Sequence, residues 1–527
     1  MLTRRFVKQG TRPVYLLARI YGCHHLPRQT RWISSDRGDG SDAKKDSIKS
    51  SPVRIWGSIA VLGILAGFVY RKVAYHEDNR KEDKAVPNLD QLCPSGGEDK
   101  ISYGPIPTSE DVTRQLNETT WSYPKTGSSA VHRYDGAQLG SNSPCEDAYL
   151  HGRLANPIRG SRSTDEWMAW AVFDGHCGWQ MSDLLTRELV PAVRHALNGF
   201  SALPSLTSKE FEEIIHRALK SAFTGLDDRL VKTAAATIES ADLSFPEKAR
   251  RLEAAYAGAC ALLALFDPHT RTLRVASTGD CRAVLGRRIP GNGRWEAREL
   301  TTDQTGANAD EAARIRAAFP DEPGIVAGGR VWGMQPSRTF GDGMWKWPAQ
   351  LKKTLRDYYN GLSLPSATRY KDYKEGPYLT AEPAVTTVEV PENEDSFLIL
   401  ATDGLWDTMS SEDAANLVGW WIEWQRKGAR TPPPKPWTSG SKKEADTGPT
   451  VLGWERNCQF EEANATVQDG NAAVHLVRNG LGGADDETVR GALTFRYPNS
   501  RDIRDDITVQ VVFFNSPFGS DGKGGGK

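Results

Sequence analysis

The chain has 527 residues, of which 39% are hydrophobic and 25% charged, and its formal net charge is −1 at pH 7. This composition is typical of a globular protein with a sizeable core. Lys and Arg are spread along the chain without a basic stripe interleaved with aromatic residues, which argues against a nucleic-acid-binding protein. The 7 cysteines include no Cys-x-x-Cys pair, which argues against a disulfide framework and a structural zinc site.

The N-terminal residues 1–35 are rich in Arg and contain no Asp or Glu before Asp36. An acid-poor, Arg-rich start that can form a basic amphipathic helix is typical of a mitochondrial presequence. The alternative is a disordered basic tail. We expect targeting to mitochondria, because the acid-free stretch ends where a polar spacer begins.

Residues 55–70 form an uncharged run bounded by Arg54 on one side and by Arg71 and Lys72 on the other. The run is slightly short of the roughly 17–25 residues usual for a membrane span, but snorkelling basic residues with interfacial Trp56 and Tyr70 could let it cross. A buried core helix is the alternative. We predict one transmembrane helix that holds the protein at the mitochondrial inner membrane.

The rest of the chain is predicted to be a linker over residues 71–126, a folded domain over 127–515 and a Gly-rich flexible tail over 516–527. A Pro-, Ser- and Lys-rich insertion at 430–450 is expected to be disordered. Hydrophobic periodicity predicts strands at 167–173, 259–267, 273–277, 283–286, 385–390, 397–402 and 507–515. It predicts helices at 181–197, 209–236, 310–318, 411–426 and 470–481.

The most informative motif is Asp174-Gly175-His176-Cys177-Gly178, at the end of the apolar run 170–173. A carboxylate is a hard ligand suited to Mg²⁺ or Mn²⁺, and a glycine can bring its carbonyl close to the same ion. His176 can exchange a proton near neutral pH. Alone, the motif is more typical of a plain turn, so its function depends on partners elsewhere in the sequence.

Acidic partners occur at other expected strand ends, as Glu146 and Asp147, as Asp403 after the run 398–402, and as Asp505 and Asp506 before the run 507–512. Carboxylates from separate strands that meet at one sheet edge can hold two hard cations about 4 Å apart and activate a water. That arrangement hydrolyses phosphate esters. The sequence therefore predicts a hydrolytic metal site.

The ordered series of motifs resembles that of the type 2C metal-dependent protein serine/threonine phosphatases. Its members here are Glu146-Asp147-Ala148, Asp174-Gly175-His176-x-Gly178, and the stretches 277–284, 337–342, 401–407 and 504–509. The resemblance implies an α+β fold, a four-layer α/β/β/α sandwich of two antiparallel sheets flanked by helices. It also implies hydrolysis of phosphoserine and phosphothreonine by a metal-activated water.

Carried over residue by residue, the resemblance implies two Mg²⁺ or Mn²⁺ ions and a proton donor, His176. Asp174 would bridge the ions, and the remaining ligand positions match the Gly175 carbonyl, Asp403 and Asp505, with Glu146 and Asp147 ordering metal-bound waters. Asp280 and Asp407 match positions associated with a third, weaker metal, although Asp280 could equally cap its turn. The buried-strand position that is usually Thr is Cys260, which we expect to alter packing behind the site more than chemistry.

Within the family, the chain resembles the branch of mitochondrial pyruvate dehydrogenase phosphatase catalytic subunits, in residues 340–347 and 377–383 and in Asn142. Asn142 stands where most members have a phosphate-gripping Arg, and a neutral amide lacks the bidentate charge of guanidinium. The branch implies that the substrate and partner is the phosphorylated E1α subunit of the pyruvate dehydrogenase complex. The alternatives are another mitochondrial phosphoprotein as substrate, or a non-catalytic type 2C-like interaction protein.

Overall fold

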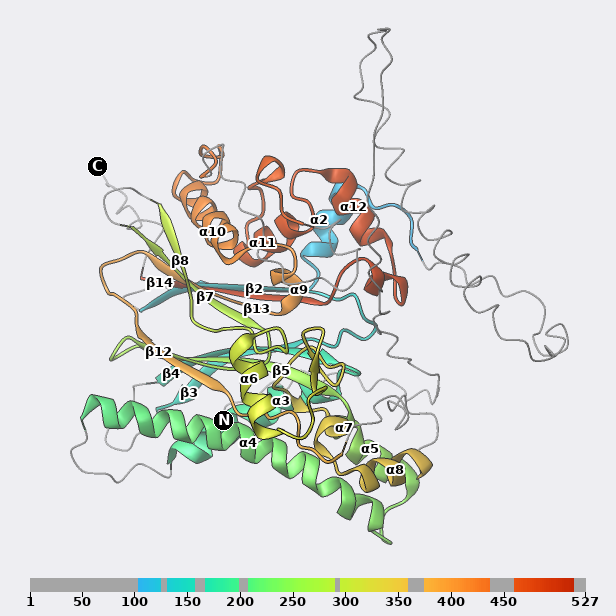
Figure 1. Cartoon of the computed structure of the whole chain (residues 1–527). Helices are drawn as coiled ribbons and strands as arrows, with labels where there is room; N and C mark the ends of the chain where they lie inside the picture. Colours follow the sequence, from blue (N-terminus) through green and yellow to red (C-terminus); the bar gives the residue numbers. More distant parts are fainter. Residues whose placement is uncertain are drawn as a thin grey trace, which may run out of the picture.

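The computed structural model describes residues 103–124, 130–156, 166–198, 207–289, 294–358, 374–436 and 459–515. These residues form four layers, with two sheets facing one another and helices on both outer faces (Figure 1). This is the α/β/β/α sandwich that the family resemblance implied, and the prediction of the fold class is confirmed.

The first sheet contains six strands in the order β1-β2-β14-β13-β7-β8, and every neighbouring pair is antiparallel. Their bounds are β1 Thr120–Pro124, β2 Val131–Leu139, β14 Ile507–Phe514, β13 Ser396–Ala401, β7 Arg282–Arg288 and β8 Trp295–Glu299. The second sheet has the order β12-β6-β5-β4-β3, with β11 paired to β5, and is also antiparallel. Its strands are β12 Ala384–Glu389, β6 Thr272–Thr278, β5 Gly258–Asp267, β4 Glu166–His176, β3 Ala148–Ala155 and β11 Phe340–Gly341.

Helices cover the outer face of each sheet (Figure 1). On the first sheet lie α2 Ser109–Leu116, α10 Ser411–Arg426, α11 Ala472–Gly480 and α12 Asp486–Thr494. On the second lie α3 Gln180–Asn198, α4 Ser208–Glu239 and α5 Phe245–Tyr256. The connection between β8 and β12 carries α6 Ala309–Ala318, the β9 Val326–Ala327 and β10 Arg330–Val331 ribbon, α7 Gly343–Lys346 and α8 Ala349–Tyr358. The remaining helical segments are short: α9 Asp403–Trp406, η3 Glu462–Asn464 and η4 Asn499–Asp502.

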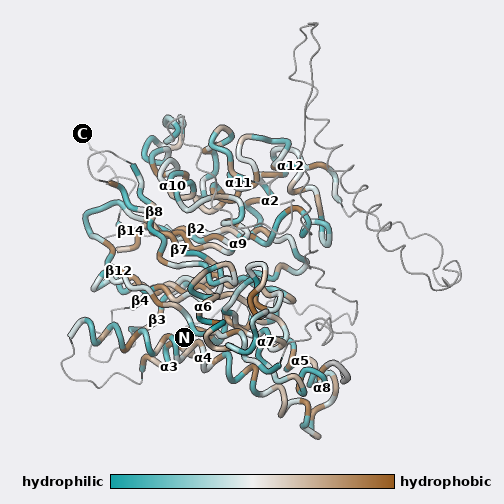
Figure 2. Tube along the Cα trace, in the orientation of Figure 1, coloured by the Kyte–Doolittle hydropathy of each residue, from teal (hydrophilic) through white to brown (hydrophobic). Residues whose placement is uncertain are grey.

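The central strands consist largely of hydrophobic residues (Figure 2), which are buried because each face of a sheet packs against another layer. In β4, Trp167 and Phe173 pack toward α3 and α4, whereas Trp170 and Val172 pack toward the first sheet. Side chains alternate across a strand, so Asp174 continues the series that faces the other sheet. This alternation places the motif's carboxylate between the two sheets.

The long helix α4 begins where the sequence provides a reciprocal cap. The Thr207 hydroxyl accepts a hydrogen bond from the Glu210 backbone, and the Glu210 carboxylate accepts one from the Thr207 backbone. Such a capping box satisfies backbone donors that the first turn leaves unpaired. The buried face of α4 then packs on α3 and on the second sheet through Phe223 and Leu226.

The linker expected over residues 71–126 ends earlier than predicted. Ser109–Leu116 forms α2, and Thr120–Pro124 forms β1, which pairs with β2. These elements were missed because α2 is only two turns long and because β1 is an edge strand with an exposed end, so neither carries a long apolar pattern. The folded part of the chain thus begins before residue 127.

Several sequence-based predictions lie outside the described residues. They are the presequence at 1–35, the transmembrane helix at 55–70, most of the insertion at 430–450 and the tail at 516–527. Among the helices that the structure describes, none combines the length and the apolar character needed to cross a membrane.

Candidate metal centre

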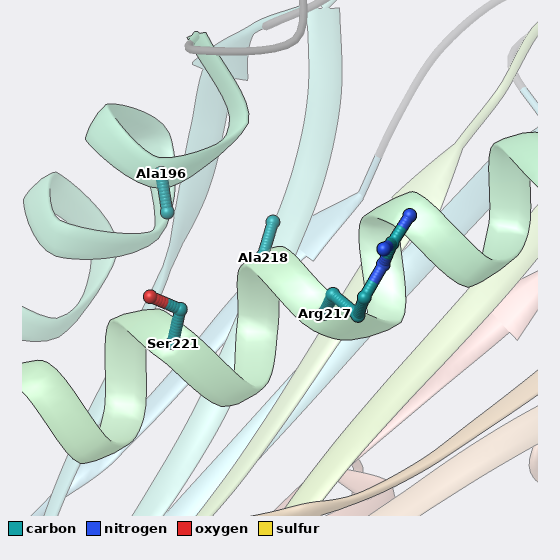
Figure 3. A pocket seen from close by; sticks show the side chains of 4 residues that line it. All are labelled: Ala196, Arg217, Ala218 and Ser221. Carbon is teal, nitrogen blue, oxygen red and sulfur yellow. The ribbon is translucent and has the colours of Figure 1, made fainter.

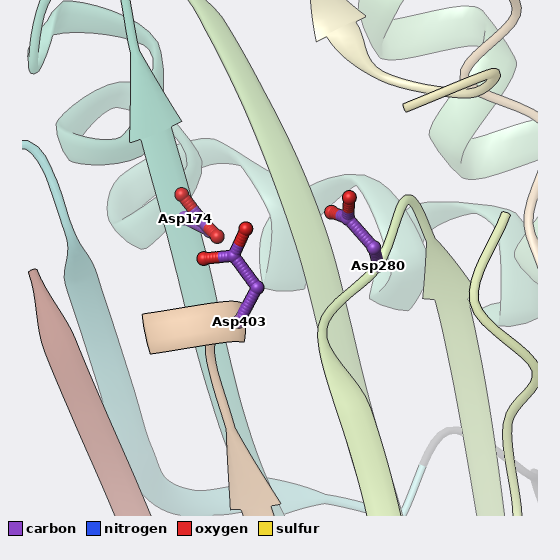
Figure 4. Close-up of side chains that lie close together, drawn as sticks. All are labelled: Asp174, Asp280 and Asp403. Atoms are coloured by element: carbon purple, nitrogen blue, oxygen red, sulfur yellow. The ribbon is translucent and has the colours of Figure 1, made fainter. Parts of the chain in front are cut away.

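Three aspartates from different parts of the chain meet at the edge between the two sheets (Figure 4). Asp174 lies near the end of β4, Asp280 lies in the turn between β6 and β7, and Asp403 is the first residue of α9 after β13. Each offers one carboxylate oxygen, and these oxygens all lie within 4.8 Å of one another. Hard anionic oxygens at this spacing are the donor set that Mg²⁺ and Mn²⁺ prefer.

The electrostatics of the cluster favour a bound cation. Desolvation, followed by repulsion from Asp403 and Asp147, raises the pKa of Asp174 well above its ordinary value. Desolvation and the charge of Asp403 also raise the pKa of Asp280 to about 7. Within the described chain, Oδ2 of Asp280 is buried and accepts no hydrogen bond. A divalent cation would neutralise this repulsion and supply the missing partner, so the residues fit the metal.

Asp147 connects the cluster to the first sheet. Its Oδ2 accepts hydrogen bonds from the Thr402 hydroxyl at 2.9 Å and from the Thr508 hydroxyl at 2.7 Å. Glu146 precedes it, and its carbonyl lies so close to Gly175 that a Cβ at that position would stand 2.1 Å from the Glu146 oxygen. Only glycine therefore lets the loop that carries Glu146 and Asp147 close over the end of β4.

The loop that carries Glu146 is organised by Asp506. The Asp506 carboxylate accepts hydrogen bonds from the backbone N–H groups of Ser141, Asn142 and Glu146 and from the Ser141 hydroxyl. The side-chain amide of Asn142 donates to Oδ2 of the same carboxylate at 2.8 Å. Asn142, the residue expected to bind substrate phosphate, is thus held in place by Asp506, which the sequence had indicated only as one of the acidic partners of Asp174.

Two of the expected metal ligands lie outside the three-aspartate cluster. The carboxylate of Asp505 accepts hydrogen bonds from the Arg501 guanidinium and from the backbone N–H of Asp506. Asp407 ends the short helix α9, one turn after Asp403. Within the described chain, the carboxylates that lie within 4.8 Å of one another are those of Asp174, Asp280 and Asp403.

His176 ends β4 and bonds to an aspartate that lies far away in the sequence. Its Nε2 lies 2.8 Å from Oδ2 of Asp342, a residue with no exposed surface. Desolvation lowers the pKa of His176, but the charge and hydrogen bond of Asp342, with smaller contributions from Asp280 and Glu146, outweigh it and raise the pKa to about 9. A Cβ on Gly258 would lie 2.1 Å from Nε2 and 2.4 Å from Oδ2, so a glycine is needed beside this pair.

Asp342 belongs to the motif stretch 337–342, but the sequence predicted no function for this residue. The only available signal was its place in that motif, because its contact with His176 joins residues 166 positions apart. The site is therefore a set of carboxylates able to hold hard cations, beside an imidazole whose protonated form is favoured by a buried carboxylate. That combination can bind a phosphate group through metal and deliver a proton to its leaving group.

The sequence matches the family described as Protein phosphatase 2C over residues 137–431, more than half of the chain. It is 36% identical over 421 residues to a protein phosphatase 2C homolog of Schizosaccharomyces pombe, a match that covers 78% of this chain and 86% of that protein. The chain belongs to the protein phosphatase 2C family. It is a protein serine/threonine phosphatase, and this family depends on Mg²⁺ or Mn²⁺.

Two further relatives are mitochondrial enzymes by name. The chain is 32% identical to the mitochondrial pyruvate dehydrogenase (acetyl-transferring) phosphatase 1 of Saccharomyces cerevisiae, over 76% of this chain and 72% of that protein. It is 30% identical to the protein of the same name from Rattus norvegicus, over 74% of this chain and 78% of that protein. The resemblance to this branch, inferred from residues 340–347, 377–383 and Asn142, is confirmed.

In this protein phosphatase 2C chain, Cys260 touches the metal cluster directly. Cys260 lies on the face of β5 that points toward the first sheet, and its Sγ donates a hydrogen bond to Oδ1 of Asp280 at 3.1 Å. The neighbouring turn fits only because residue 279 is glycine, with φ of +104° and room for no Cβ against the thiol. Cys260 therefore orients a carboxylate of the cluster in addition to packing behind it.

A cavity of about 280 Å³ lies elsewhere, between α3 and α4 in the outer helix layer (Figure 3). Ala196, Arg217, Ala218 and Ser221 line it. None of these residues belongs to the phosphatase site, and the cavity brings no cluster of catalytic or ligating groups together.

Proposed function

We propose that this phosphatase dephosphorylates, and thereby activates, the E1α subunit of the pyruvate dehydrogenase complex in mitochondria. The observation that carries the substrate is the similarity to pyruvate dehydrogenase phosphatases of yeast and rat, at 32% and 30% identity over most of both chains. The acid-free, Arg-rich residues 1–35 support the mitochondrial address. The apolar residues 55–70 would hold the protein at the inner membrane.

The proposed metal ligands are the side chains of Asp174, Asp403 and Asp505 and the carbonyl of Gly175, with Asp280 and Asp407 for a third ion and Glu146 and Asp147 for bound water. Two Mg²⁺ or Mn²⁺ ions would polarise the phosphate and lower the pKa of water. The spacing of Asp174, Asp280 and Asp403 supports this assignment. Asn142, held by Asp506, presents an amide to the phosphate without a charge, so binding depends more on contacts beyond the phosphate.

His176 is the proposed general acid. Its Nε2 is engaged by Asp342, which leaves Nδ1 to give a proton to the departing serine or threonine oxygen. The carboxylate of Asp342 favours the imidazolium form, so the proton is in place before the ester bond breaks. This role is consistent with a protonated histidine next to an anionic cluster.

The test of the substrate uses intact pyruvate dehydrogenase complex phosphorylated on E1α. With Mg²⁺ or Mn²⁺ the purified chain should remove the phosphate and restore the activity of the complex, and EDTA should stop both. The Asp403→Asn variant, which keeps the side-chain size but loses ligand charge, is the matched control. If a phosphoserine peptide is hydrolysed while E1α keeps its phosphate, the substrate is another phosphoprotein.

The test of the address is carbonate extraction of mitochondria that contain the full chain. An anchored protein remains with the membranes, and a variant lacking residues 55–70 should be released. Release of the full chain would show that the apolar run does not span the membrane.

A further inference from the structure

A buried ion pair joins the two segments that surround the His176–Asp342 contact. Asp227 on α4 and Lys346 at the end of α7 are 2.7 Å apart, and their side chains are 7% and 4% exposed. Burying two charges is costly, and such a pair adds little net stability compared with apolar residues of the same size. A pair in this position is therefore better explained by what it holds than by stability.

Each member of the pair forms a hydrogen bond with the backbone of residues 339–341, immediately before Asp342. Oδ1 of Asp227 accepts a hydrogen bond from the Gly341 N–H at 2.8 Å, and Lys346 Nζ donates one to the Thr339 carbonyl at 2.8 Å. The Trp347 indole N–H donates to the Val231 carbonyl at 2.8 Å, which ties the end of α7 to α4 a second time.

The backbone at residues 341–342 has an unusual conformation. Gly341 has φ of +68° and Asp342 has φ of +48°, so two successive residues occupy the left-handed region. This region is unfavourable for a non-glycine residue unless its surroundings fix it. In this conformation the Asp342 N–H donates to the Ala257 carbonyl at 3.1 Å, and its carboxylate reaches Nε2 of His176.

We propose that Asp227 and Lys346 are positioning residues that fix the carboxylate of Asp342 against His176 and so set the delivery of the proton to the leaving group. This inference rests on the proposed role of His176 as general acid. Among the described residues, the hydrogen bonds of the two side chains are with each other and with the backbone of Gly341 and Thr339, so the pair would act through Asp342.

The experiment compares two substrates in the full chain with Mn²⁺, a phosphoserine peptide with a poor leaving group and p-nitrophenyl phosphate with a good one. Loss of a general acid costs on the order of 10²–10⁴-fold for a poor leaving group. For Asp227→Asn and Lys346→Gln we expect kcat on the peptide to fall on the order of 10–100-fold, the effect of a displaced catalytic group. Hydrolysis of p-nitrophenyl phosphate should change much less.

A buried pair outside the site provides a matched control. Asp469 and Arg478 are 2.8 Å apart with side chains 3% and 6% exposed, in the helix layer that covers the first sheet. We expect both Asp469→Asn and Asp227→Asn to lower the melting temperature, but Asp469→Asn should leave the ratio of the two activities unchanged. If Asp227→Asn unfolds the chain, the two activities are compared instead in Lys346→Gln and in the Asp227→Asn/Lys346→Gln double variant. The double variant removes both charges together.

A double-variant test and a spectrum separate positioning from a general structural effect. Adding Asp227→Asn to His176→Ala should cause no further loss on the peptide, and ¹⁵N NMR of the His176 ring should change in Asp227→Asn but not in Asp469→Asn. Equal losses on both substrates, or a further loss on top of His176→Ala, would refute the proposal. If His176→Ala itself reduces both activities equally, the role of His176 fails instead.

Discussion

At the scale of one residue, the buried charge of Asp174 destabilises the folded chain as long as no metal is bound. The pKa of this carboxyl is raised well above 3.8, so its ionised form is less favourable in the folded chain, and stability from this group is lost as pH rises above that value. Asp174→Asn removes the penalty. In EDTA at pH 7 we expect the variant to melt higher by roughly 2 °C, the shift that about 1 kcal/mol causes in a large domain.

The same variant should lose the response to metal. Mn²⁺ is expected to raise the melting temperature of the unmodified chain by linkage, to raise that of Asp174→Asn less, and to restore no phosphatase activity to the variant. Melting curves and phosphopeptide assays with and without EDTA measure both effects. Full activity of Asp174→Asn would remove this aspartate from the metal centre.

The role of Asp506 in holding the loop at residues 141–146 could not be predicted from the sequence. Its carboxylate accepts hydrogen bonds from the N–H groups of Asn142 and Glu146, from the Asn142 amide, and from both the N–H and the hydroxyl of Ser141. An asparagine would turn an NH₂ group toward some of these donors, because it has one acceptor oxygen where aspartate has two.

We therefore expect Asp506→Asn to lower the free energy of unfolding by about 3 kcal/mol, a value in line with lost hydrogen bonds to a buried charge. It should also weaken the binding of Mn²⁺, since the loop that carries Glu146 would no longer be fixed. Urea unfolding and calorimetric titration with Mn²⁺ measure the two effects. Asp502→Asn, an exposed neighbour, is the control and should stay within about 0.5 kcal/mol.

Site residues that belong to a sequence motif could be predicted. Those that are brought to the site only by the packing of the fold could not. Asp174, Asp280 and Asp403 each lie near or just after the end of a strand in a recognisable motif, and the structure brings them together. Asp227 and Lys346 lie 119 positions apart and carry no motif that links them. Their pairing follows from how α7 packs on α4, and single-sequence patterns do not contain that information.

At the scale of elements, the strands buried on both faces were the easiest to predict. All residues of β5, β13 and β14 are buried, so each appears in the sequence as a run made up mostly of apolar residues. The strands β1, β3 and β8 lie at or near sheet edges and contain exposed or half-exposed residues. Their mixed patterns gave no periodic signal, and they were missed for that reason.

The helix α6 holds the stretch 337–342 through one carboxylate. Glu311 accepts hydrogen bonds from Arg338, Arg314 and the Ser337 hydroxyl. Burial alone would raise the pKa of Glu311, but these partners outweigh it and lower the pKa from 4.5 to about 2. The group therefore contributes stability that is present above pH 4.5 and is lost as pH falls toward 2.

Glu311→Gln should cost about 3 kcal/mol at pH 7, because it leaves two arginines without their shared charge. The cost should shrink as the pH is lowered below 4.5, because the unmodified chain then loses the same interaction. Urea unfolding at pH 7 and at pH 4 tests this difference. Asp310→Asn, an exposed neighbour on α6, should change stability by no more than about 0.5 kcal/mol at either pH. A cost for Glu311→Gln that does not depend on pH would contradict the assignment.

At the scale of the whole molecule, the two sheets share one polar end. Facing residues of the sandwich change from apolar Val512 and Phe514 to polar Gln510 and Thr508 along β14. Gln510 donates hydrogen bonds across to the carbonyls of Leu150 and Ala171 in the second sheet. The metal cluster lies where this polar series ends. The site is therefore assembled when the two sheets pack against each other.

The segment before residue 127 belongs to this assembly. Val112 and Leu116 of α2 are 1% and 3% exposed in the core beneath α11 and α12, and Arg478 donates to the Thr113 hydroxyl at 3.1 Å. The Trp121 ring of β1 stacks on Tyr149 of the second sheet with ring centroids 3.7 Å apart. Removing this segment would also expose the edge of β2, which pairs with β1 over five residues.

A chain that begins at residue 127 should therefore be much less stable than one that begins at residue 100. The loss of two buried apolar side chains alone is expected to cost at least about 4 kcal/mol, and the uncovered edge strand should promote aggregation. Soluble yield, urea midpoint and phosphopeptide hydrolysis compare the two chains. The chain from residue 100 is the matched control, because it lacks only the region before the first described element. Equal stability of the two would show that α2 and β1 are dispensable for the fold.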